Sequence, residues 1–86
     1  MHVGATVGFS SDPATVRERA RRMEEAGLQS LWTAEPLGGS DPFVRTGYLA
    51  VATSQATLVL GIVNPSWRHP VVLATGAALA SHLSGG

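Results

Sequence analysis

The sequence has no cysteine, no long apolar run and no excess of charge of either sign, and each absence excludes a class of protein. Without cysteine there are no disulfides and no thiolate metal sites. No apolar stretch approaches the roughly 18 residues of a membrane span, and the first residues lack the basic-then-apolar layout of a secretory signal. Six basic and six acidic residues cancel, so no overall field attracts nucleic acid or an anionic membrane. We therefore expect a cytoplasmic protein with neither partner.

Two nucleotide-binding motifs and a local metal motif are also missing. The glycine fingerprint G-x-G-x-x-G does not follow the first apolar segment, and no phosphate loop G-x-x-x-x-G-K occurs. The three histidines, His2, His69 and His82, are too scattered for a sequence-local metal site, so we predict no bound metal. Hydrophobic residues nevertheless make up 44% of the chain against 14% charged, which predicts a folded chain with a buried core.

Three prolines mark a repeating unit. Pro13, Pro42 and Pro70 each follow an apolar segment and a turn, and each stands at a plausible first helical position. They recur roughly every 30 residues, about the length of one strand-helix unit. The pattern predicts strands over 2–9, 30–34 and 58–63, and helices over 13–26, 43–54 and 70–83. The stretch 58–63 is the most continuous apolar run, so we expect it in the centre of the sheet.

Strands that alternate with helices on short connections predict an α/β fold with a parallel sheet and right-handed crossovers. The pattern alone fits either a doubly wound sheet or a barrel. The missing nucleotide motifs favour the barrel, and three units supply only the first part of a TIM (β/α)8 barrel, which usually needs roughly 250 residues. We therefore expect residues 1–86 to form a single partial barrel domain, too short to close alone.

One segment carries a family resemblance. Residues 60–70 read LGIVNPSWRHP, which resembles the signature of the luciferase-like oxidoreductases and monooxygenases, especially their F420-dependent branch. Further similar motifs are DP at 12–13, EEAG at 24–27, SLW at 30–32 and LSGG at 83–86, all in the family's order and spacing. The resemblance spans nearly the whole chain and implies that it ends where a fourth barrel unit begins.

The resemblance implies a cofactor, coenzyme F420 or alternatively FMN, whose ring lies at the carboxyl ends of the strands. It also implies cofactor-binding roles for Gly61, Ile62 and Asn64. The Gly61-Ile62 bond is expected to be a non-proline cis peptide that forms a bulge against the ring, at a cost of about 3 to 4 kcal/mol. Glycine suits this position because it lets the backbone approach a planar ligand.

Glu35 follows the second strand, where the family often carries an acidic residue and then a histidine near the reacting carbon. We therefore predict Glu35 as the catalytic residue, with a solvated or helix-capping role as the alternative. Pro36 replaces the histidine, which argues against the sugar-phosphate dehydrogenase activity found in part of the family. Arg68 and His69 are expected to brace the loop after the third strand.

Two aromatic residues and one glycine-rich turn have competing interpretations. Trp32 lies within a strand, where packing between sheet and helix is the commoner use, so Trp67 in the loop is the preferred candidate for lining a pocket. The stretch 38–40, Gly-Gly-Ser, is interpreted as turn material rather than an anion nest.

Two functions remain open at this stage. The chain is part of an oxidoreductase that transfers a hydride or activates oxygen on a small-molecule substrate, or it is a non-catalytic remnant or assembly module that self-associates through open sheet edges. In either case we expect the 86 residues alone to be inactive as an enzyme.

Overall fold

The computed structural model describes residues 1–8, 12–35 and 41–86. Strands and helices alternate along the chain in the order β-α-β-α-β-α. The elements are β1 (Gly4–Thr6), α1 (Pro13–Glu25), β2 (Ser30–Ala34), α2 (Pro42–Ala52), β3 (Thr57–Ile62), the 3-10 turn η1 (Pro65–Trp67) and α3 (Pro70–Leu83). In the described part of the chain, no helix is long and apolar enough to cross a membrane.

The three strands form one parallel sheet in the order β1-β2-β3. This order, with a helix after each strand, is that of the first units of a TIM barrel, and it confirms the predicted α/β class. β2 is the central strand. The prediction that residues 58–63 lie in the centre is wrong, because β3 pairs with β2 along one side and has no described strand along the other. The apolar residues of β3 therefore belong to an edge strand of the described sheet.

Each helix begins at a side chain that caps it, followed by a proline. The carboxylate of Asp12 accepts a hydrogen bond from the Thr15 amide at 3.2 Å, and Asp41 accepts from the amides two and three residues further on at 3.0 and 2.9 Å. His69 caps α3 through Nδ1, which accepts from the Val71 amide at 3.1 Å. These caps satisfy amides that have no partner within their helix. Because the strands are parallel, all three capped ends lie at the carboxyl edge of the sheet.

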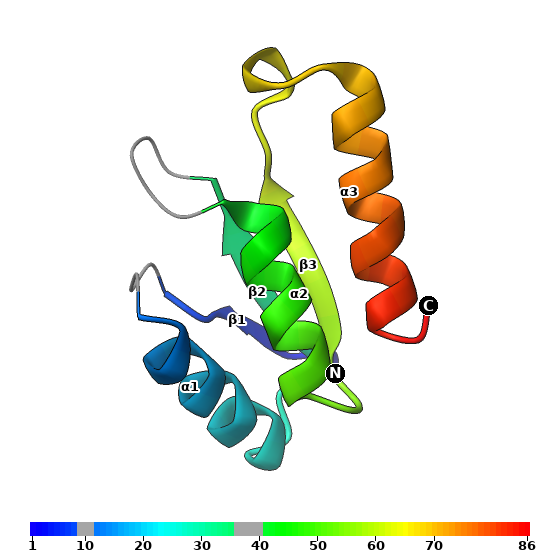
Figure 1. Ribbon diagram of the computed structural model, residues 1–86. Helices are drawn as coiled ribbons and strands as arrows, with labels where there is room; N and C mark the ends of the chain where they lie inside the picture. Colours follow the sequence, from blue (N-terminus) through cyan, green and yellow to red (C-terminus); the bar gives the residue numbers. More distant parts are fainter. Residues whose placement is uncertain (9–11, 36–40) are drawn as a thin grey trace.

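The core lies between the sheet and the helices, which cover one face of it (Figure 1). Leu31 of β2 meets Val16 and Ala20 of α1 and Leu49 of α2, and all four are almost fully buried. Val7, just after β1, completes this cluster. Two residues after Leu31, Thr33 faces the same helices. The other face of the sheet therefore carries Ser30, Trp32 and Ala34, because successive side chains of a strand alternate.

A buried arginine joins α2 to the central strand. The side chain of Arg45 is fully buried, and its Nη1 donates a hydrogen bond to Oγ1 of Thr33 at 3.1 Å. A charged group without solvent needs such partners, because burying it without hydrogen bonds is strongly unfavourable. The contact fixes α2 over the carboxyl half of β2, next to the edge where the predicted site residues lie.

The third helix packs on α2 and leaves much of its apolar surface open (Figure 1). Gly76 comes close to the Phe43 ring, where a Cβ atom would lie 3.1 Å from Cγ. Of the residues of α3 only Ala80 is buried, and Val71, Val72 and Leu79 are exposed. Monomeric soluble proteins rarely leave an apolar helix face exposed beside an unpaired strand edge.

Candidate functional site at the carboxyl edge

The structure brings the predicted site residues together where β2 and β3 end. The backbone amide of Glu35 donates to the carbonyl of Ile62 at 2.9 Å, which extends the β2-β3 pairing by one step. In return, the backbone amide of Asn64 donates to the Glu35 carboxylate at 2.9 Å. Two residues separated by 29 positions in sequence thus meet at one edge, as the parallel topology requires.

A bulge occurs in β3 at the predicted position. Thr33 pairs with Leu60 and Ala34 pairs with Ile62, so Gly61 is the extra residue between them. Gly61 and Ile62 are both exposed. The extra residue leaves a short stretch of backbone without a side chain, open to an approaching ligand.

The predicted cis peptide is not found. The Gly61-Ile62 bond is trans, like every peptide bond in the described residues. A non-proline cis bond is held only where its surroundings enforce it. Here the Ile62 side chain is 70% exposed, so no packed layer presses on the bond. The bulge prediction is confirmed, and the cis prediction is wrong for this chain.

Arg68 joins the two strand ends to α2. Its guanidinium grips both oxygens of Glu35, with Nη1 at 2.8 Å from Oε1 and Nη2 bonded to Oε2. Nη2 also reaches Asp41 at 3.2 Å, and the guanidinium carbon lies 5.3 Å from the centre of the Phe43 ring. Two-pronged contacts of this kind fix geometry as well as charge. The expectation that Arg68 braces the loop is confirmed, whereas the contact that the structure gives for His69 is the cap of α3.

These contacts set the charge of the site. Hydrogen bonds from Arg68 lower the pKa of Glu35, helped by the Asn64 amide and opposed by burial. The same contact with Glu35, aided by Asp41, raises the pKa of Arg68. Both groups are therefore charged at neutral pH. A carboxylate held in this way is suited to orienting its neighbours, and it is a weak proton acceptor because Arg68 stabilises its ionised form.

Trp32 is the residue that the sequence reasoning placed wrongly. It does not pack between sheet and helix, because it lies on the helix-free face and its side chain is 44% exposed. Its Nε1 donates to Oγ of Ser30 at 2.9 Å. The signal was present in the sequence: Leu31 is the core residue of β2, and strand alternation then puts Trp32 on the opposite face.

Trp67 belongs to the loop after β3, outside the sheet. Asn64 caps the turn η1, since its Oδ1 accepts from the Ser66 amide at 2.9 Å. Trp67 closes the turn, and its side chain is 48% exposed. The predictions that involve Pro36 and the stretch 38–40 fall on residues outside the described part of the chain.

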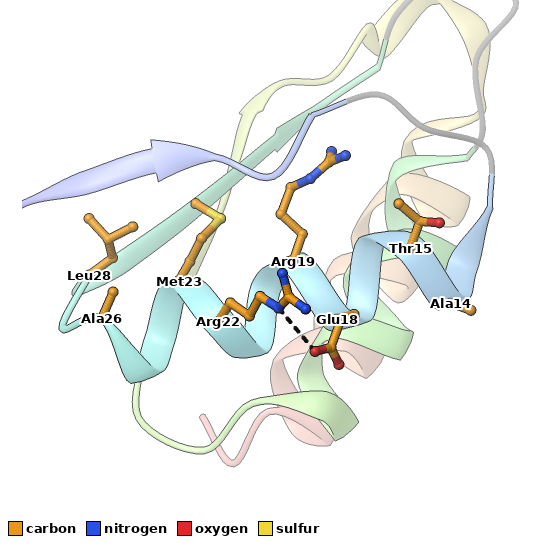
Figure 2. A pocket seen from close by; sticks show the side chains of 8 residues that line it. All are labelled: Ala14, Thr15, Glu18, Arg19, Arg22, Met23, Ala26 and Leu28. Atoms are coloured by element: carbon orange, nitrogen blue, oxygen red, sulfur yellow. Dashed lines mark hydrogen bonds and ion pairs between the residues drawn. The ribbon is translucent and has the colours of Figure 1, made fainter.

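A shallow hollow on α1 offers no comparable chemistry (Figure 2). Its charged groups already have partners: Glu18 pairs with Arg22 at 3.2 Å, and Arg19 donates to the carbonyl of Val7 at 2.7 Å. Met23 and Leu28 supply its apolar wall. In the described residues no three acidic or histidine side chains gather to hold a metal ion. The carboxyl edge of β2 and β3 is thus the candidate site.

The model of one protein family, luciferase-like monooxygenase, matches residues 1–86 and so covers the whole chain. No individual curated protein matches the chain significantly.

Proposed function

Because the chain belongs to the luciferase-like monooxygenase family, a family of flavin- or F420-dependent oxidoreductases, we propose that it forms one wall of such a cofactor site. The observation that carries the proposal is the exposed bulge at Gly61 and Ile62, set beside the linked pair Glu35 and Asn64. We favour coenzyme F420, with FMN as the alternative, on the resemblance of residues 60–70. The bound cofactor would supply the hydride transfer or oxygen activation.

In this proposal the backbone at Gly61 and Ile62 supports the ring. Gly61 has no side chain, and a planar ligand can therefore approach to van der Waals distance of the main chain. Asn64 follows just after the end of the same strand, and the Glu35 carboxylate accepts a hydrogen bond from its backbone amide. Its side-chain amide can both donate and accept hydrogen bonds. It can offer both to the ring edge or to the substrate when the hydrogen bond from the Ser66 amide to Oδ1 is broken.

Glu35 was predicted as catalytic, and that role stays a prediction. Its contacts support an orienting role: it holds the Asn64 amide on one side and Arg68 on the other. Arg68 in turn ties the loop to Asp41 at the start of α2. We propose that this cluster fixes the distance between the loop after β3 and the bulge, so that the small-molecule substrate meets the ring in one orientation.

Three strand-helix units enclose only part of a pocket. Family resemblance implies that loops of later units hold the phosphate of the cofactor, so we propose that this chain contributes the ring side of the site. Substrate turnover by the 86 residues alone is not expected. Binding of the ring is the property that these residues can show by themselves.

The test is titration of the chain with F420 and with FMN, followed by the fluorescence anisotropy of each cofactor. We expect F420 to bind more tightly, and Gly61→Val to weaken binding on the order of tenfold by placing a side chain between ring and backbone. The matched control is Thr57→Val, at the other end of β3. Gly85→Val would not serve, because Gly85 has a positive φ that valine rarely adopts, although the space around it is open. Equal affinity of the Gly61 variant and the unchanged chain would contradict the proposal.

A second candidate is a non-catalytic assembly module. The observation that favours it is the exposure of Val71, Val72, Leu79 and Leu83 on α3, beside the open edge of β3. A second copy could cover this surface and extend the sheet. Size-exclusion chromatography with light scattering tests it: a dimer that Val72→Glu dissociates, without any cofactor binding, supports the module, and a monomer that binds F420 or FMN contradicts it.

A further inference from the structure

We propose that the indole of Trp32 forms the floor on which a planar tricyclic ring rests, directly below the bulge at Gly61 and Ile62. The inference rests on the proposed function, in that the ring is that of the flavin or deazaflavin cofactor. It assigns the contact to Trp32 on the sheet, whereas the sequence favoured Trp67 in the loop. Trp32 thereby becomes a positioning residue that limits how deeply the ring can enter.

The first support is the position of Trp32 on the sheet. Leu31 and Thr33 face the helices, as their contacts with the core and with Arg45 show. Trp32 therefore faces the other way, and its side chain is 44% exposed although it belongs to the central strand. Ile62, which pairs with Ala34 beyond the bulge, is 70% exposed. A large aromatic and a large aliphatic residue thus lie open near the carboxyl edge.

The second support is the space that glycines leave around the indole. A Cβ atom at Gly4 of β1 would lie 2.9 Å from Nε1 of Trp32, and one at Gly61 of β3 would lie 3.2 Å from Cε3. The indole therefore reaches from β1 across β2 to the bulge in β3. Side chains at these two positions would push it up from the sheet. With glycine at both, the indole can lie low and present a flat surface.

The third support is that the orientation of the indole is fixed in advance. Its only polar group, Nε1, is bonded to Oγ of Ser30, a residue that is 2% exposed. The polar edge is thus satisfied within the protein, and the apolar part toward Cε3 is left beside Gly61. Aromatic stacking does not depend on a specific hydrogen-bond pattern, and it is favourable for any planar conjugated ring. A preoriented indole loses little freedom when such a ring binds.

The test uses the fact that the chain has two tryptophans, Trp32 and Trp67. Trp67→Phe leaves only the floor residue, and Trp32→Phe leaves only the loop residue, so the two variants are matched. The probes are riboflavin, which has the ring without phosphate, and then FMN and F420. The readout is static quenching of the probe's fluorescence, because an indole quenches a flavin in this way only when the two are in contact. Far-ultraviolet circular dichroism confirms that each variant is folded, and Trp32→Leu serves as a second variant without an aromatic ring.

We expect the unchanged chain and Trp67→Phe to quench riboflavin fluorescence equally. Trp32→Phe should lose the static quenching and Trp32→Leu should bind riboflavin on the order of tenfold more weakly, the size expected for one stacking contact. Quenching that survives in Trp32→Phe would overturn the inference, and so would the absence of quenching in all variants.

The outcomes separate this inference from the proposed function. If fluorescence anisotropy shows that F420 or FMN binds but Trp32 does not quench the fluorescence of the cofactor, the stacking contact with Trp32 is excluded and the cofactor assignment is retained. If Trp32 quenches the fluorescence of riboflavin but neither F420 nor FMN binds, the stacking contact with Trp32 is supported and the cofactor assignment is excluded. If the helix-free face is merely a packing surface, riboflavin is quenched by neither tryptophan.

Discussion

The carboxylate of Glu24, at the end of α1, accepts a hydrogen bond of 2.7 Å from the backbone amide of Ala56, just before β3. The preceding amides of Ser54 and Gln55 bond to the same carboxylate at 3.0 and 2.7 Å. One side chain thus organises the whole α2-β3 turn. It lies at the amino edge of the sheet, opposite the candidate site, where it joins the first unit to the third.

Glu24→Ala should lower the free energy of unfolding by about 1.5 to 3 kcal/mol, the usual contribution of hydrogen bonds to a charged group. Chemical denaturation followed by circular dichroism measures it. Glu25→Ala is the control, since this exposed neighbour should change stability by no more than about 0.5 kcal/mol. Equal effects of the two substitutions would show that the turn does not depend on Glu24.

Stability should fall in acid because of the same carboxylate. Burial raises the pKa of Glu24, but the amides of Ala56, Gln55 and Ser54 outweigh it and hold the pKa below its ordinary value of 4.5. Its contribution is therefore complete above the unfolded pKa and is lost as the pH falls through the lower, folded pKa. Denaturation curves measured from about pH 7 to about pH 3 should show this loss. Glu24→Gln should flatten it; an unchanged pH profile would contradict the assignment.

Arg68→Lys should weaken cofactor binding even though the charge is kept. A lysine cannot grip both oxygens of Glu35 and reach Asp41 at the same time, so the loop that carries Asn64 loses its fixed position. We expect an affinity for F420 or FMN lower on the order of tenfold. Arg21→Lys, at an exposed pair with Glu18, is the control and should bind as the unchanged chain does.

Two helical glycines should respond differently to alanine. Gly47→Ala in α2 should stabilise the chain by about 0.5 to 1 kcal/mol, because the new Cβ meets only Leu83 Cδ1 at an ordinary 3.8 Å. Gly76→Ala in α3 places a Cβ 3.1 Å from the Phe43 ring, and the crowding should cancel that gain. Thermal unfolding compares the two. A gain at position 76 as large as at 47 would show that α3 can shift away from Phe43.

The cap of α3 should tolerate asparagine but not alanine. His69→Ala removes the acceptor for the Val71 amide and should destabilise the chain by about 0.5 to 2 kcal/mol, while His69→Asn restores an acceptor and should be near neutral. Urea denaturation distinguishes them. His82→Ala, at an exposed position in the last turn of the same helix, controls for loss of an imidazole. If Asn and Ala are equally destabilising, the cap is not what His69 contributes.

The local elements were predictable because local signals determine them. The strand at 30–34 and the helix starts at Pro13 and Pro70 agree with the structure, since a cap and a proline define each helix start. The side-chain partners of Glu35 were not predictable, because Arg68 is 33 residues away and only the fold brings the two together. Trp32 shows a different limit. Strand alternation from the buried Leu31 puts Trp32 on the opposite face of the sheet, but the prediction followed the general tendency of tryptophan to be buried.

The capped helix starts have a further consequence for anions. A helix amino terminus normally attracts negative charge, yet at α1 and α2 that place is occupied by the carboxylates of Asp12 and Asp41. The partial positive charge at the amino ends of α1 and α2 is therefore already balanced by a carboxylate of the same chain. A phosphate that approached these helix ends would meet the negative charges of Asp12 and Asp41. A cofactor whose ring lies above β2 and β3 is best accommodated with its charged tail directed away from them.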